Sequence, residues 1–205
     1  MGSEHRKPGN FATFDSIYGY LTSEYGFPVL ASRSPYPHDK TLSHPIAELS
    51  VHPTLEAILH ILNADLSSAH FLCRHMQNRP AWEGMYIHGL LHRVEGDYEN
   101  AKAWYGDVAD SECFKVVWSE GGLEGARDFI DGIKEFRDMK GGRELRERLS
   151  KTSEGEIDAL VAWCKQQFGT EKVQDARQQA WVEPSEEHRA MAAKMIVGGE
   201  GWRNF

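Results

Sequence analysis

The chain has 205 residues, of which 40% are hydrophobic and 26% are charged. These proportions are typical of a soluble globular protein and argue against global disorder. Acidic residues outnumber basic ones by 31 to 23 and give a formal charge of −8, so we expect neither nucleic acid nor an anionic membrane as a partner. No run of about 18 apolar residues occurs, which also argues against a membrane-spanning helix.

The N-terminal segment is polar and lacks the apolar core of a secretory signal. The three cysteines, Cys73, Cys113 and Cys164, are odd in number and widely spaced, an arrangement that argues against a disulfide framework and a CxxC metal site. We therefore expect three small buried thiols and a cytoplasmic protein.

We expect residues 1–12 to form a flexible N-terminal tail. The first helix is predicted over 13–25, where apolar side chains recur at helical spacing and Gly26 and Pro28 supply the stop. Residues 28–53 are rich in proline, which predicts an extended or turn-rich arm. Such an arm either packs over the domain as a cover or acts as a lid over a site.

Helical periodicity is strongest in the middle of the chain. It predicts two consecutive helix pairs within residues 53–110, with Pro53 in the first helical turn. No segment alternates between apolar and polar residues with a period of two, so we expect no sheet. The prediction is a single all-α domain over 1–205, with about seven or eight helices.

Further helices are predicted within residues 121–197. One runs over 125–139 and ends at a glycine pair. The next is predicted to begin at a capping box formed by Ser153 and Glu156. A last helix is expected after Pro184.

The two central helix pairs repeat each other with an offset of 32 residues, so that His60 corresponds to His92. Small residues occupy equivalent positions, Ala57 and Gly89, where they would let the paired helices approach closely. We therefore predict one helix–turn–helix unit used twice, with an N-capping acid at the start of each second helix. The identical pairs are Leu59 and Leu91, His60 and His92, Asp65 and Asp97, and Ala69 and Ala101.

Gly89, the run Gly96-Asp97-Tyr98-Glu99-Asn100-Ala101 and Tyr105 resemble a tetratricopeptide unit. The resemblance covers about residues 50–112 and implies two helical hairpins, stacked side by side with a concave face, at the centre of the domain. Two units are fewer than the roughly three that such an array needs, so the remaining helices must complete the core. The rest of the chain resembles only helical proteins of no assigned function. First-helix positions that the family fills with large apolar or aromatic side chains here hold Glu56, His60, His88 and His92.

Histidines on one face of a predicted helix are candidates for a metal centre. His88 and His92 are one helical turn apart, which brings their Cβ atoms within about 6 Å, and Glu95 follows on the same face. Their counterparts one repeat earlier would lie nearby if the two first helices pack in parallel. Three histidines and one carboxylate suit zinc or iron. The candidate metal ligands are His88, His92, His60 and Glu56, with His70 and His75 as further candidates.

Two other interpretations of these histidines stay open. Imidazoles that are buried and hydrogen-bonded to carboxylates or carbonyls would be purely structural. His60 occupies the same repeat position as His92, which favours a structural role. The other interpretation is a role in proton transfer.

A different binding site is predicted on the concave face that the resemblance implies. Arg93 with Tyr86 would bind the carboxylate of a peptide end or of a small acid. The alternative is an exposed Arg93 paired with Glu95 or Asp97, a surface ion pair of little energetic weight. The predicted ligand-binding residues are Tyr86, Arg93 and Glu83.

The sequence thus favours a non-catalytic helical binding or scaffold protein that recognises a peptide or a small acidic ligand. The alternative is a small metal- or histidine-dependent enzyme with a histidine cluster in the helical core. No nucleophile elbow, glycine-rich phosphate loop or HExxH motif occurs, so no catalytic residue is assigned. Trp163 lies off the apolar stripe of its helix and Trp202 in the tail, which is consistent with a ligand pocket, a homodimer contact or packing against the core.

Overall fold

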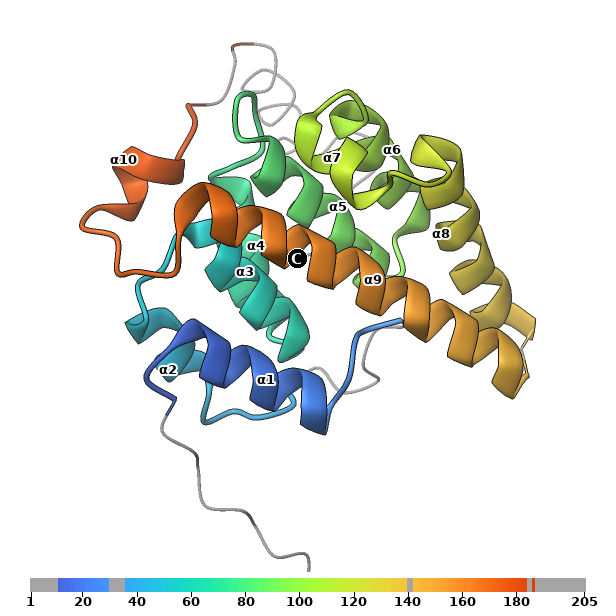
Figure 1. The fold of residues 1–205 in the computed structure, drawn as a ribbon, viewed down its shortest axis with the longest axis horizontal. Coiled ribbons are helices and arrows are strands. Elements are labelled where there is room, and N and C mark those ends of the chain that lie inside the picture. Colours follow the sequence, from blue (N-terminus) through green and yellow to red (C-terminus); the bar gives the residue numbers. More distant parts are fainter. Residues whose placement is uncertain (1–10, 30–35, 140–141, 184–185, 187–205) are drawn as a thin grey trace, which may run out of the picture.

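The computed structural model describes residues 11–29, 36–139, 142–183 and 186. Within these ranges the chain forms ten helices and no strand (Figure 1), which confirms the all-α prediction but exceeds the expected number of helices. The predicted tail up to residue 10, the predicted helix after Pro184, and Trp202 lie outside the described residues. None of the described helices combines the length and the apolar character that crossing a membrane requires.

Helix α1 (Phe14–Glu24) forms where the sequence predicts it. Thr13 and Ser16 make a capping box in which each hydroxyl accepts a hydrogen bond from the other residue's backbone N–H, both at 3.2 Å. Helix α2 (Ser43–Glu48) lies inside the proline-rich arm, where the sequence predicts an extended or turn-rich chain and no helix. Pro45 is compatible with α2 because the N–H groups of a first helical turn have no helical acceptor.

Two helical hairpins follow, α3 (Pro53–Leu62) with α4 (Leu66–Arg74) and α5 (Trp82–Glu95) with α6 (Tyr98–Val108). Each turn contains one residue in the left-handed conformation, Ala64 with φ 55° and Gly96 with φ 85°. The next residue donates its backbone N–H to the carbonyl of a histidine in the last turn of the first helix, at 2.8 Å to His60 and at 2.9 Å to His92. Because this is the hydrogen bond of a Schellman-type helix end, the repeated sequence produces a repeated turn.

The two turns differ in how the second helix is capped. Asp65 accepts hydrogen bonds from the backbone N–H and the hydroxyl of Ser68, at 3.4 and 2.9 Å, as the sequence predicts. Asp97 makes no side-chain capping bond, and its carboxylate instead accepts from the Asn100 side chain at 3.4 Å. Both acids therefore occupy the N-cap position, as predicted, but only Asp65 makes the capping hydrogen bond.

Gly89 sets the distance between α5 and α6. A Cβ atom at this position would lie 2.8 Å from Cδ1 of Tyr105 and 2.9 Å from Cβ of Trp104, closer than carbon atoms pack. The predicted close approach is therefore confirmed for the second hairpin, and it brings the aromatic side chains of α6 directly against α5.

Helix α9 runs across the molecule and packs against α3, α7 and α8 (Figure 1). The predicted helix start at Ser153 is wrong, because α9 begins at Arg143 and both Ser153 and Glu156 are buried inside it. Helices α7 and α10 were not predicted, and α8 begins slightly earlier than expected. The bounds of these helices are Glu112–Val117 for α7, Gly122–Met139 for α8, Arg143–Phe168 for α9 and Ala176–Ala180 for α10.

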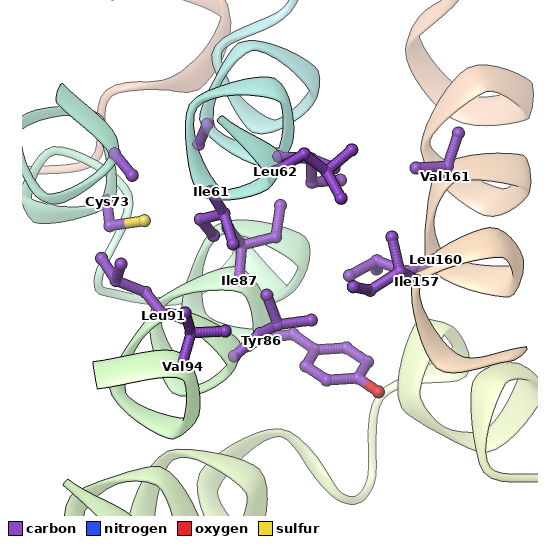
Figure 2. Close-up of a cluster of buried hydrophobic side chains, with 14 of the residues drawn as sticks. Ile61, Leu62, Cys73, Tyr86, Ile87, Leu91, Val94, Ile157, Leu160 and Val161 are labelled. Carbon is purple, nitrogen blue, oxygen red and sulfur yellow. The ribbon is translucent and has the colours of Figure 1, made fainter. Parts of the chain in front are cut away.

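The core lies between the two hairpins and α9 (Figure 2). Ile61 and Leu62 of α3, Ile87 and Leu91 of α5 and Leu160 of α9 are buried there. The three cysteines are free and buried, which confirms that they form no disulfide. Burial raises the pKa of each thiol, so these cysteines pack as small apolar residues rather than as nucleophiles.

Candidate metal centre

Arg93 lies in the core and binds a carboxylate of the same chain. Its Nη2 atom is 2.7 Å from Oε2 of Glu156 on α9, and both side chains are closed to solvent. Arg93 also donates to the backbone carbonyl of Pro28 at 3.2 Å. The interpretation of Arg93 as an exposed residue paired with Glu95 or Asp97 is therefore wrong.

Two tyrosines also donate hydrogen bonds to the Glu156 carboxylate. Tyr86 donates to its Oε1 atom at 3.1 Å, and Tyr105 donates to the same oxygen. Burial, together with the charge of Glu156, raises the pKa values of both hydroxyls well above their usual range. Burial works to lower the pKa of Arg93, but the Glu156 charge outweighs it and raises that pKa. The predicted clamp of Arg93 and Tyr86 thus holds an internal carboxylate.

Glu83, the third predicted ligand-binding residue, lies at the start of α5. Its carboxylate accepts a hydrogen bond from the indole N–H of Trp163 at 2.7 Å, which explains why Trp163 stands off the apolar stripe of α9. None of the three side chains predicted to bind an acidic ligand is free to do so without breaking a bond inside the domain.

Sequence reasoning missed Glu156 as a partner of Arg93, although the sequence contains a signal for it. Glu156 falls on the same inward stripe of α9 as Ile157 and Leu160. A carboxylate on an apolar stripe requires a buried cation or several hydrogen-bond donors. The capping-box interpretation assigned Glu156 to a helix end and so concealed this requirement.

His60 and Glu56 do not join the histidines of the second hairpin. His60 lies between two carboxylates, with Nε2 3.8 Å from Glu56 and Nδ1 3.2 Å from Asp65. The Nδ1 contact is close but lacks ideal hydrogen-bond geometry. Burial works to lower the pKa of His60, but the two carboxylates outweigh it and raise that pKa. This arrangement matches the structural interpretation, and the predicted convergence of Glu56 and His60 with His88 and His92 is wrong.

The described residues contain one group of side chains with the spacing of a metal centre: His70 of α4 with His92 and Glu95 of α5. One ligand atom from each lies within 4.8 Å of the other two. His70 Nε2 is 2.8 Å from Oε1 of Glu95, and His92 Nδ1 is 3.5 Å from Oε2. His92 was predicted as a ligand, His70 was named as a further candidate, and Glu95 was placed on the same helical face.

Hydrogen bonds and charge from two neighbouring histidines prepare Glu95 to act as an ionised ligand. Burial works to raise its pKa, but hydrogen bonds and charge from His70 and His92 outweigh it and lower the pKa to about 2. The side chains of His70 and Glu95 keep 18% and 29% of their surface exposed. An ion therefore has a route from solvent to these two ligands, while His92 lies deeper, with its Nε2 atom 3.2 Å from the side-chain amide of Asn100.

His88, predicted as a ligand, borders this group. Its ring stacks on that of His92 with centroids 4.8 Å apart, and it meets the His70 ring edge-on at 5.7 Å. Burial and the neighbouring histidines lower the pKa of His88 to about 3, which keeps it neutral. Its buried Nδ1 atom has no hydrogen-bond partner. The last candidate, His75, packs on Trp181 at 3.9 Å between centroids and stands apart from the group.

Comparisons with known proteins add no further assignment to this centre. No family model matches the chain, and neither the curated proteins nor the solved structures contain a match. The centre must therefore be interpreted from its own residues, which are two imidazoles and one carboxylate held together by two helices of different hairpins.

Proposed function

We propose that this protein binds a divalent transition metal ion, with His70, His92 and Glu95 as ligands. The observation that carries the proposal is that one donor atom of each residue lies within 4.8 Å of the others. Ligand atoms around a tetrahedral zinc ion are about 3.3 Å apart, so small side-chain rotations bring the three donors to bonding distance.

The chemistry of the donors supports zinc or iron(II) rather than a hard cation. Two imidazoles with one carboxylate are a ligand set that proteins use for both metals, whereas calcium and magnesium prefer sites made entirely of oxygen atoms. The low pKa of Glu95, about 2, keeps this ligand ionised at neutral pH. Less proton competition favours metal binding at that residue.

The predicted recognition of a peptide or small acidic ligand has weaker support. Arg93 and Tyr86 are occupied by Glu156, and Glu83 is bonded to Trp163. An external carboxylate would have to displace a buried one that already has an arginine and two tyrosines around it, at a considerable cost. Metal binding has to break only the partly exposed hydrogen bond between His70 and Glu95 and displaces no buried carboxylate.

The test is a zinc titration of the full-length protein in competition with a chromophoric chelator. We expect one zinc ion per chain, and binding weakened by at least about tenfold in the variants His70→Ala and Glu95→Gln. His44→Gln is the matched control, because the His44 side chain is 78% exposed and lies outside the centre.

Thermal unfolding supplies a second readout. A ligand that binds only the folded state at about 100 times its Kd stabilises the protein by about 2.7 kcal/mol, so zinc should raise Tm and EDTA should reverse the increase. The absence of saturable binding for zinc, iron(II) and cobalt(II) in the wild-type protein would overturn the proposal.

A further inference from the structure

His88 borders the proposed centre and, like His70 within it, has a buried Nδ1 atom without a hydrogen-bond partner. His88 as a whole is 6% exposed. Buried polar atoms are nearly always paired, and an unpaired one destabilises the fold. An exception of this kind therefore points to a partner, such as an ion, that completes the site.

The packing around His88 restricts where such a partner can lie. The ring of Trp104 from α6 stacks on His88 with centroids 4.6 Å apart at an angle of 30°. The rings of His92 and His70 occupy neighbouring positions, at 4.8 and 5.7 Å. The indole packs on one face of the imidazole, and the rings of two proposed metal ligands, His92 and His70, lie beside it.

The spacing of His88 along the helix is that of a chelating pair. His88 and His92 lie one turn apart on α5, and two histidines at this spacing on one helical face can bind the same metal ion. His88 lies outside the group whose donor atoms are already within 4.8 Å, so its ring has to rotate to reach the ion.

We propose that His88 is the fourth protein ligand of this metal ion, which makes the centre a closed site of three histidines and one glutamate. This inference rests on the proposed function, because it requires that His70, His92 and Glu95 bind the ion. Sites with four protein ligands are structural, whereas catalytic zinc sites keep a position for water or substrate. Since His70 belongs to α4 and the other three ligands to α5, the ion would clamp the first hairpin to the second.

The decisive measurement counts the histidines bound to zinc in the wild-type protein. Long-range proton–nitrogen NMR of ¹⁵N-labelled protein, recorded with and without one equivalent of zinc, reports which imidazole nitrogens bind the metal. We expect three histidines with a metal-bound nitrogen, and the loss of one of these signals in His88→Gln. Two bound histidines, assigned to His70 and His92, would overturn the fourth-ligand proposal and leave the proposed function intact.

A chelator-competition titration gives an independent readout. We expect His88→Gln to weaken zinc binding by at least about tenfold, while the exposed-site control His44→Gln leaves it unchanged. Equal zinc affinity in wild type and His88→Gln contradicts the proposal. If the wild-type protein binds none of zinc, iron(II) and cobalt(II), the proposed function and this inference both fail. Because the NMR count needs no variant, the proposal stays testable even if His88→Gln unfolds.

Discussion

The two hairpins have the same turn, but different side chains surround the equivalent histidine in each. In the first, His60 lies between Glu56 and Asp65, a carboxylate on each side of the ring. In the second, the position equivalent to Glu56 is His88, and the equivalent of His60 is surrounded by imidazoles as well as by Glu95. An imidazole between two carboxylates forms a structural ion pair, whereas several imidazoles beside one carboxylate form a set of metal donors. Two substitutions in the repeat, His88 for Glu56 and Glu95 for Asn63, thus change what an equivalent histidine can do.

A second difference concerns the core positions that follow the histidines. Ile61 of the first hairpin packs among aliphatic side chains (Figure 2), whereas its equivalent, Arg93, binds Glu156 of α9. The first hairpin is therefore attached to α9 by apolar contacts, and the second also by a buried ion pair. The mutation with the largest expected effect on stability tests this contrast between apolar contacts and a buried ion pair.

Glu156→Ala should destabilise the protein by about 3–5 kcal/mol, because it leaves the guanidinium of Arg93 buried without its counter-ion. Urea unfolding followed by circular dichroism measures the change. Ile61→Ala is the matched variant in the first hairpin, and its cost comes from a cavity instead, about 2–5 kcal/mol.

The double variant Arg93→Met with Glu156→Leu separates the two causes. Replacing both partners by apolar residues removes the unpaired charge, so we expect it to recover part of the stability that Glu156→Ala loses. A double variant less stable than Glu156→Ala would show that the ion pair contributes more than the avoidance of an unpaired charge.

A smaller effect is expected where the helices of each hairpin meet. Gly89→Ala would place a Cβ atom 2.8 Å from the Tyr105 ring. Overpacking of this kind costs about 1–3 kcal/mol, which outweighs the gain of up to about 1 kcal/mol from better helix propensity. The reverse substitution at the equivalent position, Ala57→Gly, should also destabilise, by about 1 kcal/mol. A Gly89→Ala variant that melts above wild type would contradict the close-approach interpretation.

The smallest effect is a dependence of stability on pH in the first hairpin. The pKa of His60 is raised in the folded protein above its usual value of about 6.5. Its contribution to stability is therefore fully present below about pH 6.5 and is lost as the pH rises through the folded-state pKa. The stability difference between wild type and His60→Gln should be larger at pH 5.5 than at pH 9, measured as free energies of unfolding.

His44→Gln provides the control for this measurement. His44 forms an exposed ion pair with Glu48, and surface pairs contribute little to stability, so its difference from wild type should change little over the same range. A difference for His60→Gln that grows with pH would reverse the expected sign and refute the paired-carboxylate explanation.

Local signals were sufficient to predict most helices from the sequence. Apolar spacing predicted α1 and the four helices of the hairpins, and the Gly96-Asp97 turn marked where α6 begins. A local sequence pattern was misinterpreted where tertiary packing decides its role. Ser153 and Glu156 have the spacing of a capping box but lie inside α9, because the helix extends to Arg143 and turns both side chains into the core.

The sequence by itself determined the all-α class, the repeated hairpin and the histidine pair of α5, because spacing along a helix decides these features. Only the tertiary structure decided which side chains meet. His70 reaches Glu95 because α4 packs on α5, and Glu156 reaches Arg93 because α9 crosses the hairpins. Helix periodicity specifies which face is buried, but the crossing of two helices specifies which donor on one face lies opposite a carboxylate on the other.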